Sequence, residues 1–458
     1  MKKLWGGRFK KRTNPLFEAF SRSASIDTQL LYDDLVGSLA HARMLGKIGV
    51  LSKGEAARLT GALSKLIKEY IEDKLVYDEG AEDVHTFVEA LLVKRVGEAA
   101  KKLHTARSRN DQVTLDTRLY CKRSILSLVR QLEQFQESIV HAAKKYEEVI
   151  IPGYTHLRHA QPVHLSHHLL AYCEMFERDK GRLFDLYRRV DVLPLGSGAL
   201  AGTTIPIDRE YVAKLLGFSK VSENSIDAVS DRDYVVEMLC VLSLLSMHFS
   251  RIAEELILWS TREFHFVEID EAFCTGSSMM PQKQNPDFLE LVRGETARVY
   301  GDLMGSLAMM KALPLSYNRD MQLDKTFLMD SLMRAHQISH LFPALFETLK
   351  LDQHAIECQL SDDGLLATDL AEYLVQKRVP FRKSHEAVGN LMRFLEEEDK
   401  RLSSLSISQF KKFSPAFKED VFDLLSVESS VARKKSRGGT GTKEVKKAIA
   451  KWERKLFR

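Results

Sequence analysis

Proline and glycine are missing from long windows of this 458-residue sequence. No proline occurs in residues 16–151 or 207–280. Within these intervals, residues 98–151 and 218–275 also lack glycine. Because these two residues are the strongest helix breakers, their absence leaves room for unusually long helices.

Cysteine is scarce as well, and the five residues present lie far apart with no C-x-x-C pair. This spacing matches neither a disulfide framework nor a zinc site, and it is typical of a reducing compartment. A large charge excess is also lacking, since the sequence has 67 basic and 63 acidic residues and a net charge of +4. The N-terminus has positive charge but no apolar run behind it, unlike a signal peptide. We therefore expect a soluble, cytoplasmic protein with no bulk field to attract nucleic acid.

Two stretches could suggest other partners, and both have simpler explanations. The most apolar stretch, residues 234–249, is short for a bilayer span and contains Glu237 and His248, so no membrane contact is expected. The basic segment 431–458 repeats apolar residues at helical spacing. This pattern predicts a helix that docks its apolar side and turns its lysines to water, not to nucleic acid.

Three long helices are predicted, and the first two lie in the windows that lack helix breakers. Residues 110–148 carry an apolar stripe, and a helix of that length would measure about 57 Å. Residues 232–262 are apolar nearly all round, which requires burial on every side. The third helix is predicted to begin at Asn285, a good N-cap, with Pro286 at its first position.

Helices of this length imply a bundle, most simply one shared between subunits. We therefore predict an all-α protein with three helical domains. The expected ranges are 1–107 for an N-terminal helical domain, 108–360 for the central long-helix bundle, and 361–458 for a C-terminal helical domain. The central bundle is expected to form the core of a homotetramer.

Polar loops interrupt this helical pattern. HTARSRNDQ, residues 104–112, presents Arg109 and Asn110 where a helix begins, so an anion site and an ordinary capped helix start both stay open. LPLGSGALAGT, residues 193–203, matches a dinucleotide fingerprint in its glycine spacing. Pro206 stands where the helix of that motif should run, which argues against a nucleotide site.

A third loop, PGYTHLRHAQP at residues 152–162, is rich in histidine. Five histidines fall between His156 and His168, which invites a metal interpretation. No acidic or thiol ligand accompanies them before Cys173 and Glu174, so no metal is predicted. His156 differs from the others because it follows the turn residues of this loop, where a general acid or base is better placed than on a helix face.

A fourth loop, GSSMMPQKQNPD at residues 276–287, has neither the period of a helix nor the alternation of a strand. Lys283 is the only charged residue from Ala272 to Pro286. Backbone and hydroxyl donors beside a lone cation suit the binding of an anion. The glycine and two methionines are compatible with a mobile lid.

The same loop resembles the signature of the fumarase, aspartase and argininosuccinate lyase superfamily. KLWGGRF, TARSRNDQV, PGYTHL with AQP, LPLGSGALAGT and YNRDMQLDK resemble argininosuccinate lyases within it. The resemblance implies cleavage of a C–N bond by β-elimination, giving arginine and fumarate with no metal or organic cofactor. A base removes a proton beside a carboxylate, fixed donors and a cation stabilise the resulting charge, and an acid protonates the leaving nitrogen.

The resemblance also implies roles for individual residues. His156 and Ser277 form the acid–base pair, Glu290 hydrogen-bonds His156, and Lys283 meets the developing charge. Which of His156 and Ser277 is the base stays open, because a neutral histidine is basic whereas a serine needs a strongly lowered pKa. The implied substrate-binding residues are Ser25, His85, Arg109, Asn110, Thr155, Gln161, Arg232, Asn285, Tyr317, Gln322 and Lys325.

Three positions depart from the family pattern. Gln284 stands where a second lysine is frequent, Arg158 where glutamine is common, and His159 where arginine is common. Two alternatives also stay open on the same scaffold, an adenylosuccinate lyase-type enzyme and a crystallin-like structural protein. The SRND and YNRDMQLDK motifs favour the argininosuccinate type, and the retention of His156, Ser277 and Lys283 favours an enzyme.

Overall fold

A computed structural model describes residues 11, 13–78 and 80–457 of the chain; the KLWGGRF motif lies outside them. The residues group into two compact units. Unit 1 comprises residues 1–130, 179–246 and 295–336, and unit 2 comprises residues 131–178, 247–294 and 337–458. The division into three domains along the sequence stays a prediction.

Five long helices contribute residues to both units. They are α7 (Arg109–Lys145), α8 (Leu165–Val190), α11 (Asp233–Ser260), α12 (Asp287–Met310) and α13 (Asp324–Thr348). Two of the predicted helices are present with slightly shorter bounds. The third begins at Asp287, not Asn285, because Asn285 pairs with Thr275 in a short strand and the carbonyl of Pro286 accepts the N–H of Glu290.

Helix α11 is long and apolar enough to cross a membrane by length and composition. The sequence argument that this stretch is too short was therefore wrong, since the helix has 28 residues. Its most apolar window is 61% buried inside the structure, a pattern that core helices of soluble proteins share. Composition and burial together identify it as a core helix.

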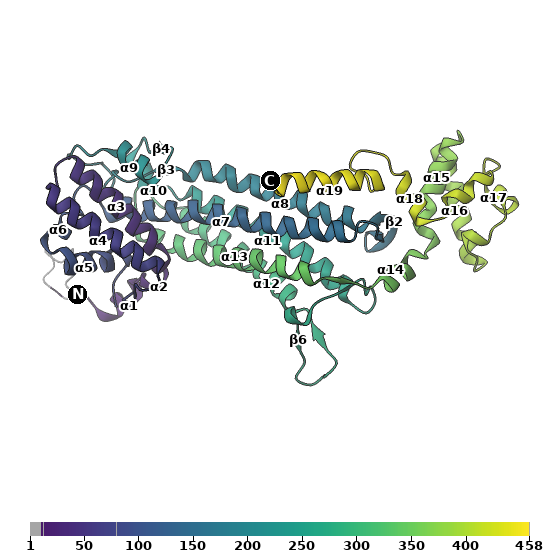
Figure 1. Cartoon of the computed structure of the whole chain (residues 1–458), viewed down its shortest axis with the longest axis horizontal. Helices are drawn as coiled ribbons and strands as arrows, with labels where there is room; N and C mark the ends of the chain where they lie inside the picture. The colour runs from purple at the N-terminus through teal and green to yellow at the C-terminus, as the bar shows by residue number, and fades with distance from the viewer. Residues whose placement is uncertain (1–10, 12, 79, 458) are drawn as a thin grey trace. The chain divides into compact units, whose positions relative to one another are not determined.

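The core of unit 1 is formed largely by residues of α3 (Leu31–Lys47), α4 (Lys53–Ile71) and α5 (Val84–Val96), which are drawn in purple in Figure 1. Helix α4 begins with a reciprocal capping box between Ser52 and Glu55 and buries Leu59, Leu63 and Leu66 at helical spacing. The remaining elements of unit 1 are α1 (Pro15–Ser21), α2 (Ala24–Asp27), α6 (Glu98–Lys101), α9 (Arg209–Leu216), α10 (Ser225–Ser230) and the parallel pair β3 (Val192–Leu193) and β4 (Lys220–Val221).

Unit 2 contains an aromatic cluster to which four of the long helices contribute. Phe135 of α7 lies 5.0 Å from both Phe176 of α8 and Phe342 of α13, measured between ring centroids. Phe249 of α11 stacks on Phe135 and Phe342. Rings at these separations add specific contacts to the area they bury, so the cluster holds these helix segments in register.

Short strands and the C-terminal helices complete unit 2. Antiparallel pairs are formed by β1 (Ile150–Thr155) with β2 (Arg158–His164), β5 (Val267–Glu268) with β8 (Lys350–Leu351), and β6 (Thr275–Gly276) with β7 (Gln284–Asn285). The helices are α14 (Gln353–Leu360), α15 (Ala367–Gln376), α16 (Phe381–Glu397), α17 (Ile407–Phe413), α18 (Val427–Arg433) and α19 (Thr442–Leu456). Leucine and phenylalanine side chains of α15 to α17 form a second core.

The basic C-terminal segment folds as predicted from its periodicity. Helix α19 buries Val445, Ile449 and Trp452. Its lysines form ion pairs with acidic residues of unit 2, among them Lys455 with Glu177 at 2.8 Å. The positive charge of this helix is therefore partly neutralised by acidic residues of the same unit.

Candidate active site

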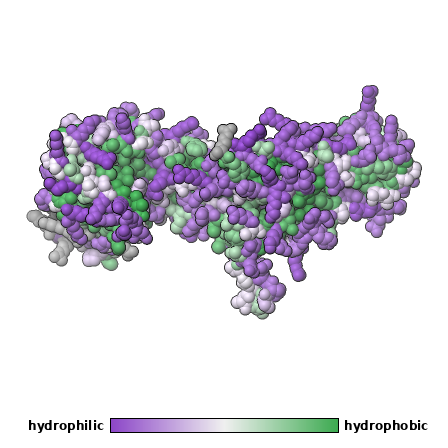
Figure 2. Space-filling model, in the orientation of Figure 1, coloured by the Kyte–Doolittle hydropathy of each residue, from purple (hydrophilic) through white to green (hydrophobic). Residues whose placement is uncertain are grey.

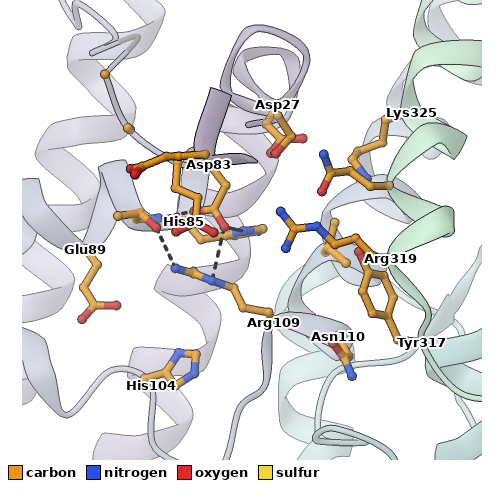
Figure 3. A pocket seen from close by; sticks show the side chains of 18 residues that line it. Asp27, Asp83, His85, Glu89, His104, Arg109, Asn110, Tyr317, Arg319 and Lys325 are labelled. Atoms are coloured by element: carbon orange, nitrogen blue, oxygen red, sulfur yellow. Dashed lines mark hydrogen bonds and ion pairs between the residues drawn. The ribbon is translucent and has the colours of Figure 1, made fainter. Parts of the chain in front are cut away.

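A pocket of about 500 Å³ opens in unit 1 (Figure 3). Residues around α2, the loop before α5, the start of α7 and the segment before α13 line it. The lining carries charges of both signs. The acidic residues include Asp27, Asp83 and Glu89, and the basic residues include Arg109, Arg319 and Lys325.

His85 on α5 lies at the base of this pocket and is buried. Its Nε2 atom is 2.8 Å from Asp116 Oδ2 and 3.9 Å from Asp34 Oδ1, and its Nδ1 atom is 3.8 Å from Asp83 Oδ2. Burial lowers the pKa of His85, but hydrogen bonds to Asp116 and Asp83 outweigh it and raise that pKa to about 9. Protonation of His85 is therefore favoured at neutral pH, although burial and Asp34 also raise the pKa of its partner Asp116 to about 7.

Arg109 extends this charged arrangement to the pocket surface. Asp83 caps α5 by accepting the N–H of Thr86 at 2.7 Å, and its other oxygen is 3.5 Å from Arg109 Nε. Arg109 also donates to the Thr86 hydroxyl at 3.1 Å. Although burial opposes ionisation, His85 and Arg109 hold the pKa of Asp83 below its ordinary value. The first turn of α5 thus orients a guanidinium toward the pocket.

The SRND and LPLGSG motifs meet beside the pocket. The carboxylate of Asp111 accepts hydrogen bonds from the N–H groups of Gly196 at 3.0 Å and Gly198 at 2.8 Å. Asn110, which lines the pocket, donates to the carbonyl of Ala199 at 3.1 Å. Burial raises the pKa of Asp111 to about 6 despite these bonds. The glycine-rich loop therefore binds a carboxylate of its own chain, in agreement with the argument against a nucleotide site.

A second wall of the pocket contains Lys325 (Figure 3). Its Nζ atom donates to Asp324 at 3.0 Å, and Asp324 also pairs with the buried guanidinium of Arg232. Burial opposes the charge on Lys325, but Asp324 and Asp27 raise its pKa above the ordinary value. Asp27 is bonded by the Ser23 hydroxyl, and its pKa is raised because burial outweighs the nearby cation.

The hairpin of unit 2 presents His156 on a strained turn. Strands β1 and β2 pair up to Thr155 and Arg158, so that two residues, His156 and Leu157, connect them. Both have positive φ, 54° and 56°, the geometry of a type I′ turn that usually requires Asn or Gly. His156 is exposed at this tip, and Gln161 lies on β2 behind it.

The loop between β6 and β7 carries Ser277 and Lys283 on a projecting segment with a mixed hydrophilic and hydrophobic surface (Figure 2). The Ser277 hydroxyl oxygen accepts the N–H groups of Met279 at 3.2 Å and Met280 at 3.0 Å. Lys283 is exposed, and Glu290 is exposed in the first turn of α12. The loop thus orders its serine locally and leaves its cation accessible.

Comparisons with known proteins identify the family. A family model described as "Lyase" matches residues 7–301, and one described as "Argininosuccinate lyase C-terminal" matches residues 364–432. The argininosuccinate lyase of Moorella thermoacetica is 50% identical over 447 residues, 98% of this chain and 96% of that protein. That of Desulforamulus reducens is 48% identical over 454 residues, 99% of both chains. The chain belongs to the argininosuccinate lyase family.

Solved structures agree with this assignment. EDDS lyase in complex with formate is 27% identical, with a TM-score of 0.81 over 98% of this chain and 91% of that chain. A class II fumarase from Schistosoma mansoni, 15% identical, has a TM-score of 0.76 over 88% and 91% of the two chains and shows the fold alone. The predicted family, lyase class and all-α fold are therefore confirmed.

The pocket in unit 1 of this chain contains part of the predicted site. Six of the predicted substrate-binding residues line it: His85, Arg109, Asn110, Tyr317, Gln322 and Lys325. Ser25 is exposed on α2 while Ser23 and Asp27 face the pocket, and Arg232 lies behind Lys325 against Asp324. Arg232 is thus placed to order the pocket rather than to line it.

The other predicted residues belong to unit 2. They are Thr155, His156, Gln161, Ser277, Lys283, Asn285 and Glu290. The predicted hydrogen bond between His156 and Glu290 does not occur within the part of the chain that the structure describes. Helix α7 has 37 residues and is therefore about 55 Å long, with Asn110 in its first turn and the strand of Thr155 following its other end.

One buried cluster has the composition of a metal site. Asp34, His85 and Asp116 each offer a ligand atom, and these atoms lie within 4.8 Å of one another. Because His85 is hydrogen-bonded to Asp116 and has a raised pKa, we assign an ion pair to this cluster. The histidines from His156 to His168 form no such group in the described ranges.

Proposed function

We propose that the chain catalyses the β-elimination of argininosuccinate to arginine and fumarate, the last step of arginine biosynthesis. The observation that carries this proposal is identity of 48% and 50%, over nearly the whole chain, to relatives named argininosuccinate lyase. The two family-model matches, to residues 7–301 and 364–432, agree with this assignment. The pocket in unit 1 supports the proposal independently through its chemistry.

The pocket suits the amino-acid end of the substrate. A zwitterionic amino acid needs a cation for its carboxylate and a carboxylate for its ammonium group. Lys325 and Arg319 offer the cations on one wall, and Asp27 and Asp83 offer carboxylates nearby (Figure 3). We assign the arginine portion to this pocket, with Asn110, Tyr317 and Gln322 as further hydrogen-bonding partners.

The catalytic groups are proposed to be those of unit 2. His156 and Ser277 serve as the acid–base pair, and the chemistry allows either of them to be the base. Lys283, Asn285 and the N–H groups of the β6–β7 loop stabilise the charge that develops when the proton beside the carboxylate is removed. Thr155 and Gln161 hold the fumarate portion. Because His156 and Glu290 are not hydrogen-bonded within the described part of one chain, Glu290 is assigned to raise the basicity of His156 from a neighbouring subunit.

These two sets of residues are proposed to meet between subunits. The length of α7 argues against a site built from both of its ends in one chain. Antiparallel packing of α7 against a neighbour brings one chain's start beside another chain's end. Large exposed apolar side chains on the long helices, such as Met304 at 63% and Leu291 at 64% exposure, suit burial against further copies. We therefore propose a homotetramer with shared active sites.

We further propose a cytoplasmic enzyme that needs no metal, cofactor, nucleic acid or membrane. Elimination beside a carboxylate requires acid, base and charge stabilisation, all of which side chains supply. The burial of α11 favours a core helix over a membrane span. The ion pairs that lysines of α19 form with Glu148 and Glu177 of the same unit favour a structural role for these lysines.

The experiment that tests the activity follows fumarate by its ultraviolet absorbance in purified protein given argininosuccinate or adenylosuccinate. We expect release of fumarate from argininosuccinate only. Equal or faster turnover of adenylosuccinate would transfer the chain to the related nucleotide-processing class. A folded protein inactive on both would favour a structural role on this scaffold.

A further inference from the structure

A chain of hydrogen bonds runs from the hairpin of unit 2 to the start of its C-terminal helices. The Tyr154 hydroxyl lies 3.0 Å from His159 Nε2, and His159 Nδ1 lies 2.7 Å from Asp362 Oδ2. Tyr154 and His159 are cross-strand partners on β1 and β2. They are the pair immediately before the terminal pair, Thr155 and Arg158, that closes the turn at His156.

The turn that this pair supports is not favoured by its own sequence. A non-glycine residue with positive φ is strained, and His156 and Leu157 occupy that region consecutively. Neither side chain has the short amide that lets asparagine tolerate this conformation. Such a turn persists only when the surrounding structure determines it more strongly than the local sequence opposes it.

Both ends of the hydrogen-bond chain are anchored. Asp362 accepts the N–H of Gly364 at 2.8 Å with its second oxygen, so its carboxylate caps the 3₁₀ turn Asp363–Leu366. The next residue, Asp363, accepts from Arg401 at 2.9 Å. At the other end, the Tyr154 ring packs 5.4 Å from Phe264, measured between ring centroids. The hairpin is therefore tied to two separate parts of unit 2.

We propose that Tyr154, His159 and Asp362 are positioning residues that hold the left-handed turn in the conformation that presents His156. This inference rests on the proposed catalytic role of His156. None of the three is assigned contact with substrate. They act through the backbone of the turn, and a displacement of about 1 Å at a reacting group can cost on the order of 100-fold in rate.

Two substitutions of His159, by arginine and by alanine, test the proposal. Arginine, which is common at this position in the resembling family, cannot accept from the Tyr154 hydroxyl, but it can donate both to that hydroxyl oxygen and to Asp362. His159→Arg should therefore keep the anchor to Asp362 and reverse the direction of the hydrogen bond to Tyr154. His159→Ala removes both links and leaves the strand backbone in place.

The test compares kcat and KM for argininosuccinate in wild type, His159→Ala and His159→Arg. His265→Ala is the matched control, because His265 makes a similar contact of 3.3 Å with Asp352 and neighbours Phe264, yet belongs to no hydrogen bond of the Tyr154–His159–Asp362 chain. We expect His159→Ala to lower kcat about 10-fold with KM within about 2-fold, and His159→Arg to restore most of the rate. The control should retain the wild-type kcat.

Amide hydrogen exchange of residues 150–164 in the same proteins separates this inference from the proposed function. Faster exchange of the hairpin in His159→Ala, with wild-type exchange in His265→Ala, supports the positioning role even if argininosuccinate proves to be the wrong substrate. Unchanged exchange in a folded His159→Ala variant overturns it, as does an equal loss of kcat in the control. If His159→Ala does not fold, Asp362→Asn tests the same link, because asparagine can still accept the N–H of Gly364.

Discussion

The carboxylate of Asp111 accepts the backbone N–H of Gly198 at 2.8 Å, although 87 positions separate the two residues. This bond joins the first turn of α7 to the glycine-rich loop and explains why both motifs occur in one chain. Gly198 has φ of 61°, and a Cβ atom there would lie 2.7 Å from the carbonyl oxygen of Gly202. The loop therefore needs glycine at this position for both backbone angle and space.

Gly198→Ala should destabilise the fold by roughly 1–3 kcal/mol and lower activity, because the loop also supplies the Ala199 carbonyl that Asn110 contacts. Gly202→Ala is the control: its φ is 75°, but a Cβ there meets nothing within 4 Å. Urea unfolding at one fixed protein concentration measures both variants. Equal stability losses in the two would show that backbone angle alone matters and that the close approach does not.

The ion pair of His85 predicts a specific pH dependence. Its pKa is raised on folding from an unfolded value of about 6.5 to about 9. A group of this kind stabilises the fold fully below its unfolded pKa and loses that contribution as the pH rises through its folded pKa. The contribution of His85 should therefore decline from about pH 6.5 and be lost above about pH 9.

Thermal unfolding between pH 6 and 10 checks this expectation. The wild type should lose stability across that window, and His85→Asn should show a flatter profile from a lower starting point. His41→Asn serves as the control, because burial lowers the pKa of His41 to about 3 and this histidine stays neutral throughout. Burial raises the pKa of Asp116 to about 7, so this group titrates at the low end of the window and the slope between pH 8 and 10 is the one assigned to His85. A wild-type slope there that survives in His85→Asn, or in Asp116→Asn if the first variant does not fold, would assign it to other groups.

The long helices were predictable because helix breakers act locally. A window without proline or glycine limits where a helix can end, and the observed bounds of α7 and α11 differ from the expected ones by only a few residues. The start of α12 was misplaced because Asn285 is taken into a strand pair. A tertiary contact of this kind overrides the capping preference of a single residue.

The candidate site was predictable only where a motif carried it. Asp27, Asp83 and Arg319 line the pocket but were missed, because their part in the site comes from chain segments far apart in sequence. A turn at His156 was expected from the neighbouring proline and glycine. Its left-handed geometry was not, since His-Leu is an unusual pair for a type I′ turn and the hairpin is held by the distant Asp362.

Ser277→Ala should abolish turnover while leaving thermal stability close to the wild type. A positioned acid or base typically contributes about 100- to 10,000-fold in rate, and Ser277 lies in an exposed loop outside both cores. The neighbouring Ser278→Ala variant controls for changes in loop polarity. Near wild-type kcat in a folded Ser277→Ala variant would remove this hydroxyl from the mechanism.

Lys283→Met should lower both substrate affinity and kcat. The lysine charge would attract a substrate carboxylate in the ground state and would be more valuable when the second negative charge develops. Steady-state kinetics and direct binding of fumarate by calorimetry separate the two effects. An unchanged kcat with weakened binding would restrict Lys283 to recognition.

The final prediction concerns assembly and depends on the length of α7. The helix is continuous over 37 residues, so its two ends lie about 55 Å apart and no small substrate reaches from Asn110 to the strand that follows the far end. If the pocket of one chain is completed by His156 of another, a mixed tetramer can hold a pocket in which neither set carries a substitution. Size-exclusion chromatography with light scattering should first show a tetramer.

The inactive variants Asn110→Ala and His156→Ala should then regain partial activity when they are unfolded together and refolded. Some pockets of a mixed tetramer combine the intact Asn110 of one chain with the intact His156 of another, whereas neither parent can form such a pocket. Refolding each variant alone is the matched control, and differently tagged chains verify that mixing took place. Because each variant chain carries one of the two substitutions, a pocket with both residues intact has to combine residues of two chains. Verified mixed tetramers that stay as inactive as their parents, or a fully active monomer, would contradict the shared site.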